Sequence, residues 1–178
     1  MPMRKLDKPV VLVGMMGSGK TAVGRRLATA LGVPFRDADA EIEAAAGCSV
    51  NDIFSRYGES DFRAAESKIV MRLLDEPPHV LATGGGAFMD AGTRARIKAR
   101  AISVWLKADI ELLAERVARK GTRPLLKEGN PREVLEKLMH ERAPIYAEAD
   151  ITVESGAGLH EVTVKRIMAA LESMSGVS

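Results

Sequence analysis

Cysteine is almost absent from this sequence, since Cys48 is the only one among its 178 residues. A single thiol cannot close a disulfide within the chain, and it cannot supply a zinc site built from cysteines. A chain of this length buries enough apolar surface to fold without such cross-links. The low cysteine content is typical of proteins from a reducing compartment, so we expect a cytoplasmic location.

Aromatic residues and long apolar runs are also scarce. Aromatic side chains make up 4% of the sequence, too few for a platform that stacks on single-stranded nucleic acid. The 26 basic and 24 acidic residues leave a net charge of +2, without the excess of positive charge that favours nucleic acid. No apolar run approaches the roughly 18 residues that span a membrane, and the basic N-terminus lacks the apolar core of a signal peptide. We therefore expect no nucleic-acid partner and no membrane segment.

Short apolar segments alternate with longer segments of helical periodicity. The predicted strands are residues 9–13, 33–36, 80–82, 101–106 and 151–153. The predicted helices are residues 20–31, 91–99, 110–119, 131–142 and 159–174. Helical segments also fill residues 40–74, where Ser49 and Asp52 resemble a capping box and Gly58 marks a break. This alternation indicates an α/β protein whose parallel sheet is covered by helices on both faces. We expect one domain over residues 1–178, and a monomer, because no long apolar heptad pattern demands a partner.

A glycine-rich turn follows the first predicted strand. Residues 14–21, GMMGSGKT, match the pattern G-x-x-x-x-G-K-[ST], and a predicted helix follows them. A strand before and a helix after form the context in which this pattern binds nucleoside triphosphates. Its lysine reaches the β- and γ-phosphates, and its hydroxyl binds Mg²⁺. The residues predicted to bind the nucleotide are Gly17, Ser18, Gly19, Lys20, Thr21 and Ala22.

Acids and glycines follow the next two predicted strands. Asp37 and Asp39 end the second one, and a two-residue spacing along extended chain sends both carboxylates to one side. Such acids suit hydrated Mg²⁺ or a proton from an attacking hydroxyl, but the pattern also fits acids that cap the next helix. Gly84, Gly85 and Gly86 end the third strand, where they permit close approach of a ligand or form only a tight turn. Ligands of open parallel sheets bind at this edge, so all five residues are candidates for the site.

Two motifs of GTPases are missing. The third strand does not end in the usual Walker B acid, and the guanine-reading pattern Asn-Lys-x-Asp does not occur. Both absences count against a GTPase switch. Arg63, Arg123 and Arg142 carry the forked side chain that suits carboxylates and phosphates, but spacing alone does not separate them from surface arginines.

Taken in order, the motifs resemble those of the shikimate kinases, which belong to the nucleoside monophosphate kinase-like group of P-loop proteins. The similarity extends over about residues 9–171. It rests on residues 14–21 and 35–39, Phe62 and Arg63 with Glu66, residues 83–86 and 123–126, and Arg142 with Tyr146. The resemblance implies a three-layer α/β/α fold with a five-stranded parallel sheet in the order 2-3-1-4-5. It also implies a substrate-binding helical segment at about residues 40–74 and a mobile lid at about residues 118–131.

The resemblance further implies ATP-dependent phosphorylation of the 3-hydroxyl of shikimate, which yields shikimate 3-phosphate and ADP for aromatic amino acid biosynthesis. The implied substrate-binding residues are Asp39, Arg63, Gly84, Gly85, Gly86 and Arg142. The two arginines would pair with the carboxylate of shikimate, and Asp39 would hold its hydroxyls.

The resemblance also assigns metal and nucleotide contacts. Asp37 would hold Mg²⁺ through water, with Thr21 as a direct ligand. Arg116 would pack on the adenine, and Arg123 would close over the phosphates. The implied catalytic residues are Lys20, Asp39 and Arg123. The segment 154–158 lacks the arginine that often precedes a proline turn in this family, so we expect backbone contacts to adenine there.

Two alternatives stay open on the sequence. One is a kinase of the same fold that acts on gluconate or a nucleotide. The other is a regulatory module that binds ATP without catalysis. A panel of acceptors distinguishes the first, and the second predicts ATP binding without acceptor-dependent release of ADP.

Overall fold

The computed structural model describes residues 5–119, 130–156 and 158–175. Within these residues, five strands form one sheet in the order β2-β3-β1-β4-β5, and every neighbouring pair is parallel. The strands are β1 (Val10–Val13), β2 (Phe35–Asp37), β3 (Val80–Ala82), β4 (Ile102–Lys107) and β5 (Ile151–Glu154). The predicted α/β class, parallel sheet and strand order are confirmed.

Helices connect consecutive strands, as a parallel sheet requires. In the described part of the chain they are α1 (Lys20–Leu31), α2 (Ala38–Ala46), α3 (Val50–Leu74), the short 3₁₀ helix η1 (Ala87–Met89), α4 (Ala91–Arg100), α5 (Ile110–Arg119), α6 (Pro131–Tyr146) and α7 (His160–Ser175). Most follow the predicted ranges closely.

The helical segments predicted over residues 40–74 are the two helices α2 and α3. Gly47 ends α2 in the left-handed conformation, and the Ser49 hydroxyl accepts a hydrogen bond from the Asp52 N–H to cap α3. Gly58, with φ of 87°, interrupts the helical backbone inside α3. The break that the glycine predicted is therefore present, and it lies one turn before the residues that α3 brings to the site.

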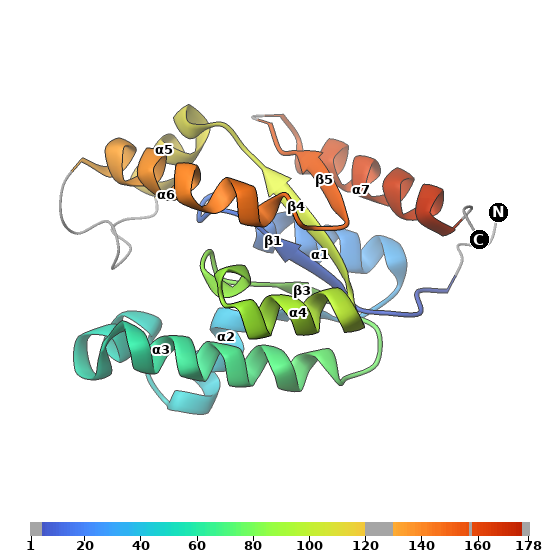
Figure 1. Cartoon of the computed structure of the whole chain (residues 1–178). Coiled ribbons are helices and arrows are strands. Elements are labelled where there is room, and N and C mark those ends of the chain that lie inside the picture. The colour runs from blue at the N-terminus through green and yellow to red at the C-terminus, as the bar shows by residue number, and fades with distance from the viewer. Residues whose placement is uncertain (1–4, 120–129, 157, 176–178) are drawn as a thin grey trace.

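The core consists of two layers, one on each face of the sheet. Alternate residues of β1 point to opposite faces: Val10 and Leu12 pack with α1 and α7, whereas Val11 and Val13 pack with helices α2 to α6. Figure 1 shows the resulting arrangement of helix, sheet and helix. β1 is fully buried from both sides, and this explains its unbroken β-branched and leucine sequence.

The edge strand β2 and its inner neighbours β3 and β1 end side by side at their carboxyl ends. The register pairs Leu12 with Ala82 and Ala82 with Asp37. The segments that follow these strands therefore meet at one edge of the sheet, where parallel α/β proteins bind ligands. No helix among the described residues is both long and apolar enough to cross a membrane.

Candidate active site

The phosphate loop, residues 14–21, links the end of β1 to the first turn of α1. Gly17 and Gly19 have φ angles of 84° and 94°, a conformation that side chains strongly disfavour. A Cβ at Gly19 would also lie 3.4 Å from a guanidinium nitrogen of Arg116. The loop therefore needs glycine at these positions both to turn and to let its neighbours approach.

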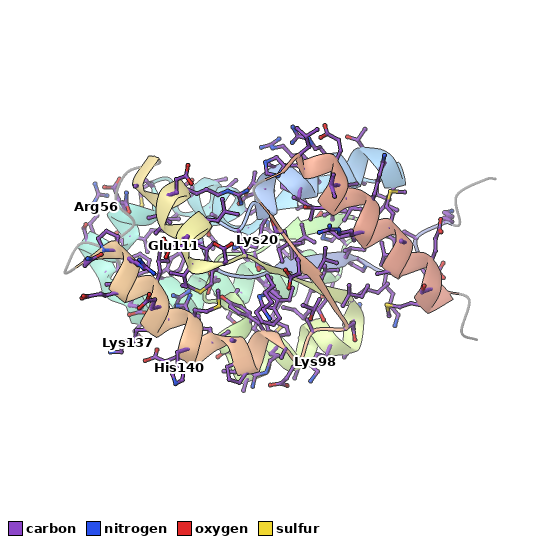
Figure 2. The ribbon with its side chains drawn as sticks, turned by 90° about the horizontal axis from the view of Figure 1, so that it is seen from above. Lys20, Arg56, Lys98, Glu111, Lys137 and His140 are labelled. Atoms are coloured by element: carbon purple, nitrogen blue, oxygen red, sulfur yellow. The ribbon has the colours of Figure 1, made fainter. Side chains whose placement is uncertain are left out.

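Lys20 begins α1 and holds its ammonium group against the phosphate loop. The group donates hydrogen bonds to the carbonyl oxygens of Gly14 at 2.7 Å and Met15 at 2.9 Å. Figure 2, seen from above, shows Lys20 near the middle of the molecule, whereas Lys98, Lys137 and His140 lie at its rim. A buried cation at a helix N-terminus beside glycine-rich backbone favours the binding of an anion.

Asp37 ends β2 and has two partners. One carboxylate oxygen accepts a hydrogen bond from the Ala40 N–H at 3.2 Å and caps α2. The other accepts the Thr21 hydroxyl at 3.1 Å. Asp37 therefore caps the helix, as one interpretation of the sequence predicted. The capping uses only one carboxylate oxygen, so the other stays directed at Thr21 of the phosphate loop.

Asp39 reaches the site by another route than the spacing predicted. It lies in the first turn of α2 and not on extended chain, because the cap at Asp37 starts the helix at Ala38. The argument from strand alternation was therefore wrong for this pair. The helical turn still directs the Asp39 carboxylate toward the glycine loop, where a Cβ at Gly84 would lie 3.1 Å from its Oδ1.

The glycine loop, defined as Gly84, Gly85 and Gly86, follows β3 and faces α3. An ideal Cβ at Gly86 would lie 2.5 Å from Nη2 of Arg63, and one at Gly84 would lie 2.9 Å from Oε2 of Glu66. The loop therefore lacks side chains where those two residues approach it. Arg63 and Glu66 are themselves paired, with Nη1 and Oε1 2.9 Å apart.

Glu66 is an unusual acid because it is 2% exposed. Burial raises the pKa of its carboxyl above the ordinary 4.5, the charge and hydrogen bond of Arg63 oppose that rise, and the nearby Asp39 carboxylate adds to it. The sequence singled out Glu66 only as part of a motif. Its role as the partner that holds Arg63 follows from the packing of α3 against the glycine loop.

Arg142 approaches the glycine loop from the opposite side, on α6. It is 7% exposed, and its Nη1 lies 3.3 Å from the position of a Cβ on Gly85. This nitrogen is buried and has no hydrogen-bond partner among the described residues. A buried donor without a partner is costly, so the arrangement favours an anion that completes it.

Arg116 joins the phosphate loop to the segment after β5. Its two terminal nitrogens donate to the Gly17 carbonyl at 3.0 Å and to the Gly156 carbonyl at 3.2 Å. His160, the first residue of α7, lines the same cavity. Sequence reasoning missed His160 because a lone histidine at a helix start belongs to no motif. Arg123, which was predicted to close over the phosphates, lies outside the described residues.

Two adjoining cavities join these groups into one site. The larger, about 260 Å³, runs from Arg116 and His160 past Lys20 and Thr21 to Asp39. The smaller, about 60 Å³, lies among Asp39, Arg63, Glu66, Arg142 and the glycine loop. Both include Met16, Asp39, Gly84 and Gly85. The two cavities therefore meet at Asp39 and the glycine loop.

Adding a methyl group at Gly86 is expected to displace Arg63. The backbone of Gly86 is compatible with alanine, with φ of −102°, but the Cβ would collide with the guanidinium group. In Gly86→Ala we expect the KM for the acceptor to rise by about 10- to 10²-fold, while the KM for ATP changes less than twofold. Gly92→Ala, where the nearest atom is 3.4 Å away, is the matched control. An unchanged acceptor KM in Gly86→Ala would contradict the placement of Arg63.

The raised pKa of Glu66 predicts a pH-dependent loss of stability. Below the unfolded-state pKa near 4.5 both states hold the neutral acid, and as pH rises through the higher folded-state pKa the folded protein must bury a charge. Wild-type stability should therefore fall through this window relative to Glu66→Gln, so the Tm of the variant minus that of wild type should increase from pH 4.5 to 7. Thermal unfolding at several pH values measures it. Glu148→Gln is the control: the hydrogen bond from Lys98 lowers the pKa of this carboxyl, so its titration lies below about pH 4.5 and the Tm difference should change little over the same range. A flat difference for Glu66→Gln would refute the assignment.

The fold and site define a P-loop kinase, in which a phosphate loop faces a small arginine-lined cavity at the edge of a parallel sheet. Residues 16–172 match the shikimate kinase family. A shikimate kinase of Caulobacter vibrioides is 59% identical over 164 residues, 92% of this chain and 82% of its own length. One from Paramagnetospirillum magneticum is 58% identical over 167 residues, 94% of this chain and 86% of its own. The chain belongs to the shikimate kinase family.

A solved structure agrees with this assignment. The shikimate kinase of Acinetobacter baumannii in complex with shikimate superimposes with a TM-score of 0.92 at 39% identity, covering 95% of each chain. The chain is therefore a phosphotransferase that uses ATP, and the alternatives of a gluconate kinase and a non-catalytic module are set aside. The roles of individual residues stay predictions.

Proposed function

We propose that this chain transfers the γ-phosphoryl group of ATP to the 3-hydroxyl of shikimate through the residues of the two joined cavities. The observation that carries the proposal is the buried Nη1 of Arg142, which has no partner among the described residues and faces the glycine loop. Arg63 approaches the same loop from α3. Two guanidinium groups on either side of a small cavity suit one carboxylate.

The nucleotide occupies the larger cavity in this proposal. The phosphate loop, from Gly17 to Ala22, binds the phosphates, and Lys20 leaves its carbonyl partners to contact the β- and γ-phosphates. Arg116 packs on the base, supported by its hydrogen bonds to the Gly17 and Gly156 carbonyls.

Mg²⁺ is the proposed cofactor. The Thr21 hydroxyl and the Asp37 carboxylate, 3.1 Å apart, are the hard oxygen donors that this ion prefers. Thr21 would bind it directly, and Asp37 would bind it through water. When bound, the ion neutralises charge on the β- and γ-phosphates.

The reaction needs positioning more than covalent help. Asp39 lies in both cavities, so it can orient the acceptor hydroxyl and accept its proton as the new O–P bond forms and ADP leaves. Lys20 and, in the proposed lid, Arg123 stabilise the negative charge of the transferring group. We propose that the protein acts as a cytoplasmic monomer, which its low cysteine content and absence of a heptad pattern support.

An acceptor panel tests the function. ADP release, followed by a coupled assay, is expected with ATP, Mg²⁺ and shikimate, and to stay at background with gluconate or with no acceptor. Release with gluconate and not with shikimate would assign a different acceptor. Binding of ATP with no acceptor-dependent release would instead indicate a nucleotide-binding module.

A further inference from the structure

Tyr146 contacts the glycine loop from the last turn of α6. Its side chain is fully buried, and its hydroxyl donates a hydrogen bond to the Gly85 carbonyl. Burial raises the pKa of this phenol to about 12, against the opposing charge and hydrogen bond of Arg142. The hydroxyl therefore keeps its proton at neutral pH and stays a donor.

The ring of Tyr146 packs in a way that phenylalanine would match. It lies against Trp105, with ring centroids 5.6 Å apart and planes tilted by 31°. Trp105 in turn flanks the start of the phosphate loop, where a Cβ at Gly14 would lie 3.5 Å from its Cδ1. The ring contacts account for an aromatic residue at this position, whereas the hydroxyl has two polar neighbours, the Gly85 carbonyl and the Arg142 side chain.

Gly85 has little space in which to move. The position of its Cβ lies 3.3 Å from Nη1 of Arg142, 3.4 Å from the Met16 nitrogen and 3.8 Å from the Gly14 carbonyl oxygen. The glycine loop is thus wedged between the phosphate loop and an arginine that stands one turn before Tyr146 on α6. The Gly85 carbonyl, which accepts the Tyr146 hydroxyl, thus lies between the two loops and the arginine.

We propose that Tyr146 is a positioning residue of the acceptor site, whose hydroxyl holds the glycine loop at the distance from the phosphate loop that in-line transfer requires. This inference rests on the proposed function. Misplacement of a reacting group by about 1 Å can lower the rate by about 10²-fold, so a single buried hydrogen bond can have a selective effect on the acceptor side.

Tyr146→Phe tests the inference, because it keeps the ring and removes only the hydroxyl. We expect kcat/KM for shikimate to fall about tenfold, while the KM for ATP stays within twofold of wild type. The emission of Trp105, the only tryptophan, should not shift, since its packing partner remains.

The matched control is Ser103→Ala, which removes a buried hydroxyl that is hydrogen-bonded to Asp150. Ser103 lies near the amino end of β4, at the opposite edge of the sheet from the site. This variant should lower the Tm without changing either KM.

The outcomes distinguish failure of the positioning role of Tyr146 from failure of the proposed function. If wild type turns over shikimate and Tyr146→Phe loses only Tm, as Ser103→Ala does, the positioning role is overturned and the proposed function stands. Equal losses in shikimate and ATP parameters, with a red-shifted Trp105 emission, would indicate general loosening and would also overturn it. If wild type shows no shikimate-dependent release of ADP, the proposed function fails, and the inference fails with it.

Discussion

Replacing Lys20 with methionine should lower kcat by about 10²- to 10³-fold, the loss found when one preorganised stabilising group is removed from a transition state. The ammonium group is the cation that the phosphate loop holds against its own carbonyl oxygens. Methionine nearly matches its length but cannot stabilise the charge on the transferring phosphoryl group. Initial rates at saturating ATP, Mg²⁺ and shikimate measure the effect.

Lys98→Met is the control for a lost lysine charge, because Lys98 is exposed and pairs with Glu148 on the surface. It should leave kcat within twofold of wild type. Circular dichroism of Lys20→Met should match wild type, since the loop keeps its glycines. A kcat within tenfold of wild type in Lys20→Met would remove Lys20 from the catalytic residues.

Replacing Arg63 with alanine should lower kcat/KM for shikimate by about 10²-fold or more, the scale for truncating one partner of a buried charge pair. The substitution removes one of the two guanidinium groups that face the glycine loop. It also leaves Glu66 buried without its partner at 2.9 Å. The carboxyl then responds by taking up a proton more readily, because an unpaired buried charge is unfavourable.

The affinity of Arg63→Ala for ATP shows whether the variant has lost only shikimate binding or has also lost its fold. Titration with ATP and Mg²⁺ should give a Kd within about twofold of wild type, because Arg63 does not line the larger cavity. Arg72→Ala removes an exposed arginine of the same helix that pairs with Glu41, and it should change neither property. Shikimate turnover near the wild-type rate in Arg63→Ala would exclude its role in binding the carboxylate.

Local patterns predicted the elements and the nucleotide side of the site. The run at Val10–Val13 is apolar at every position because both faces of β1 are buried, and the pattern from Gly14 to Thr21 requires only its own strand and helix. Both are short-range properties, which sequence spacing describes well. The strand order came from the family resemblance, because periodicity does not say which strands are neighbours.

The acceptor side could not be derived from spacing. The sequence placed Asp39 at the correct edge of the sheet, but the argument from the alternation of side chains along a strand was wrong. Asp37 caps α2, so Asp39 lies in a helical turn and not on extended chain. His160 was missed because it meets the phosphate loop only through the return of α7 to the sheet edge. Contacts of this kind join residues far apart in the chain, and no local pattern encodes them.

The scarcity of cysteine, aromatic residues and excess charge was sufficient to exclude disulfide scaffolds, cysteine-based zinc sites and nucleic-acid platforms, and the phosphate-loop motif was sufficient to predict the nucleotide. Those conclusions depend on residue types and on neighbours in sequence. The pairing of Glu66 with Arg63, the aim of Arg142 and the tether from Tyr146 to Gly85 required the packed molecule. Burial, which raises a pKa or strengthens a single hydrogen bond, is created by the surrounding helices and strands and does not belong to any one segment.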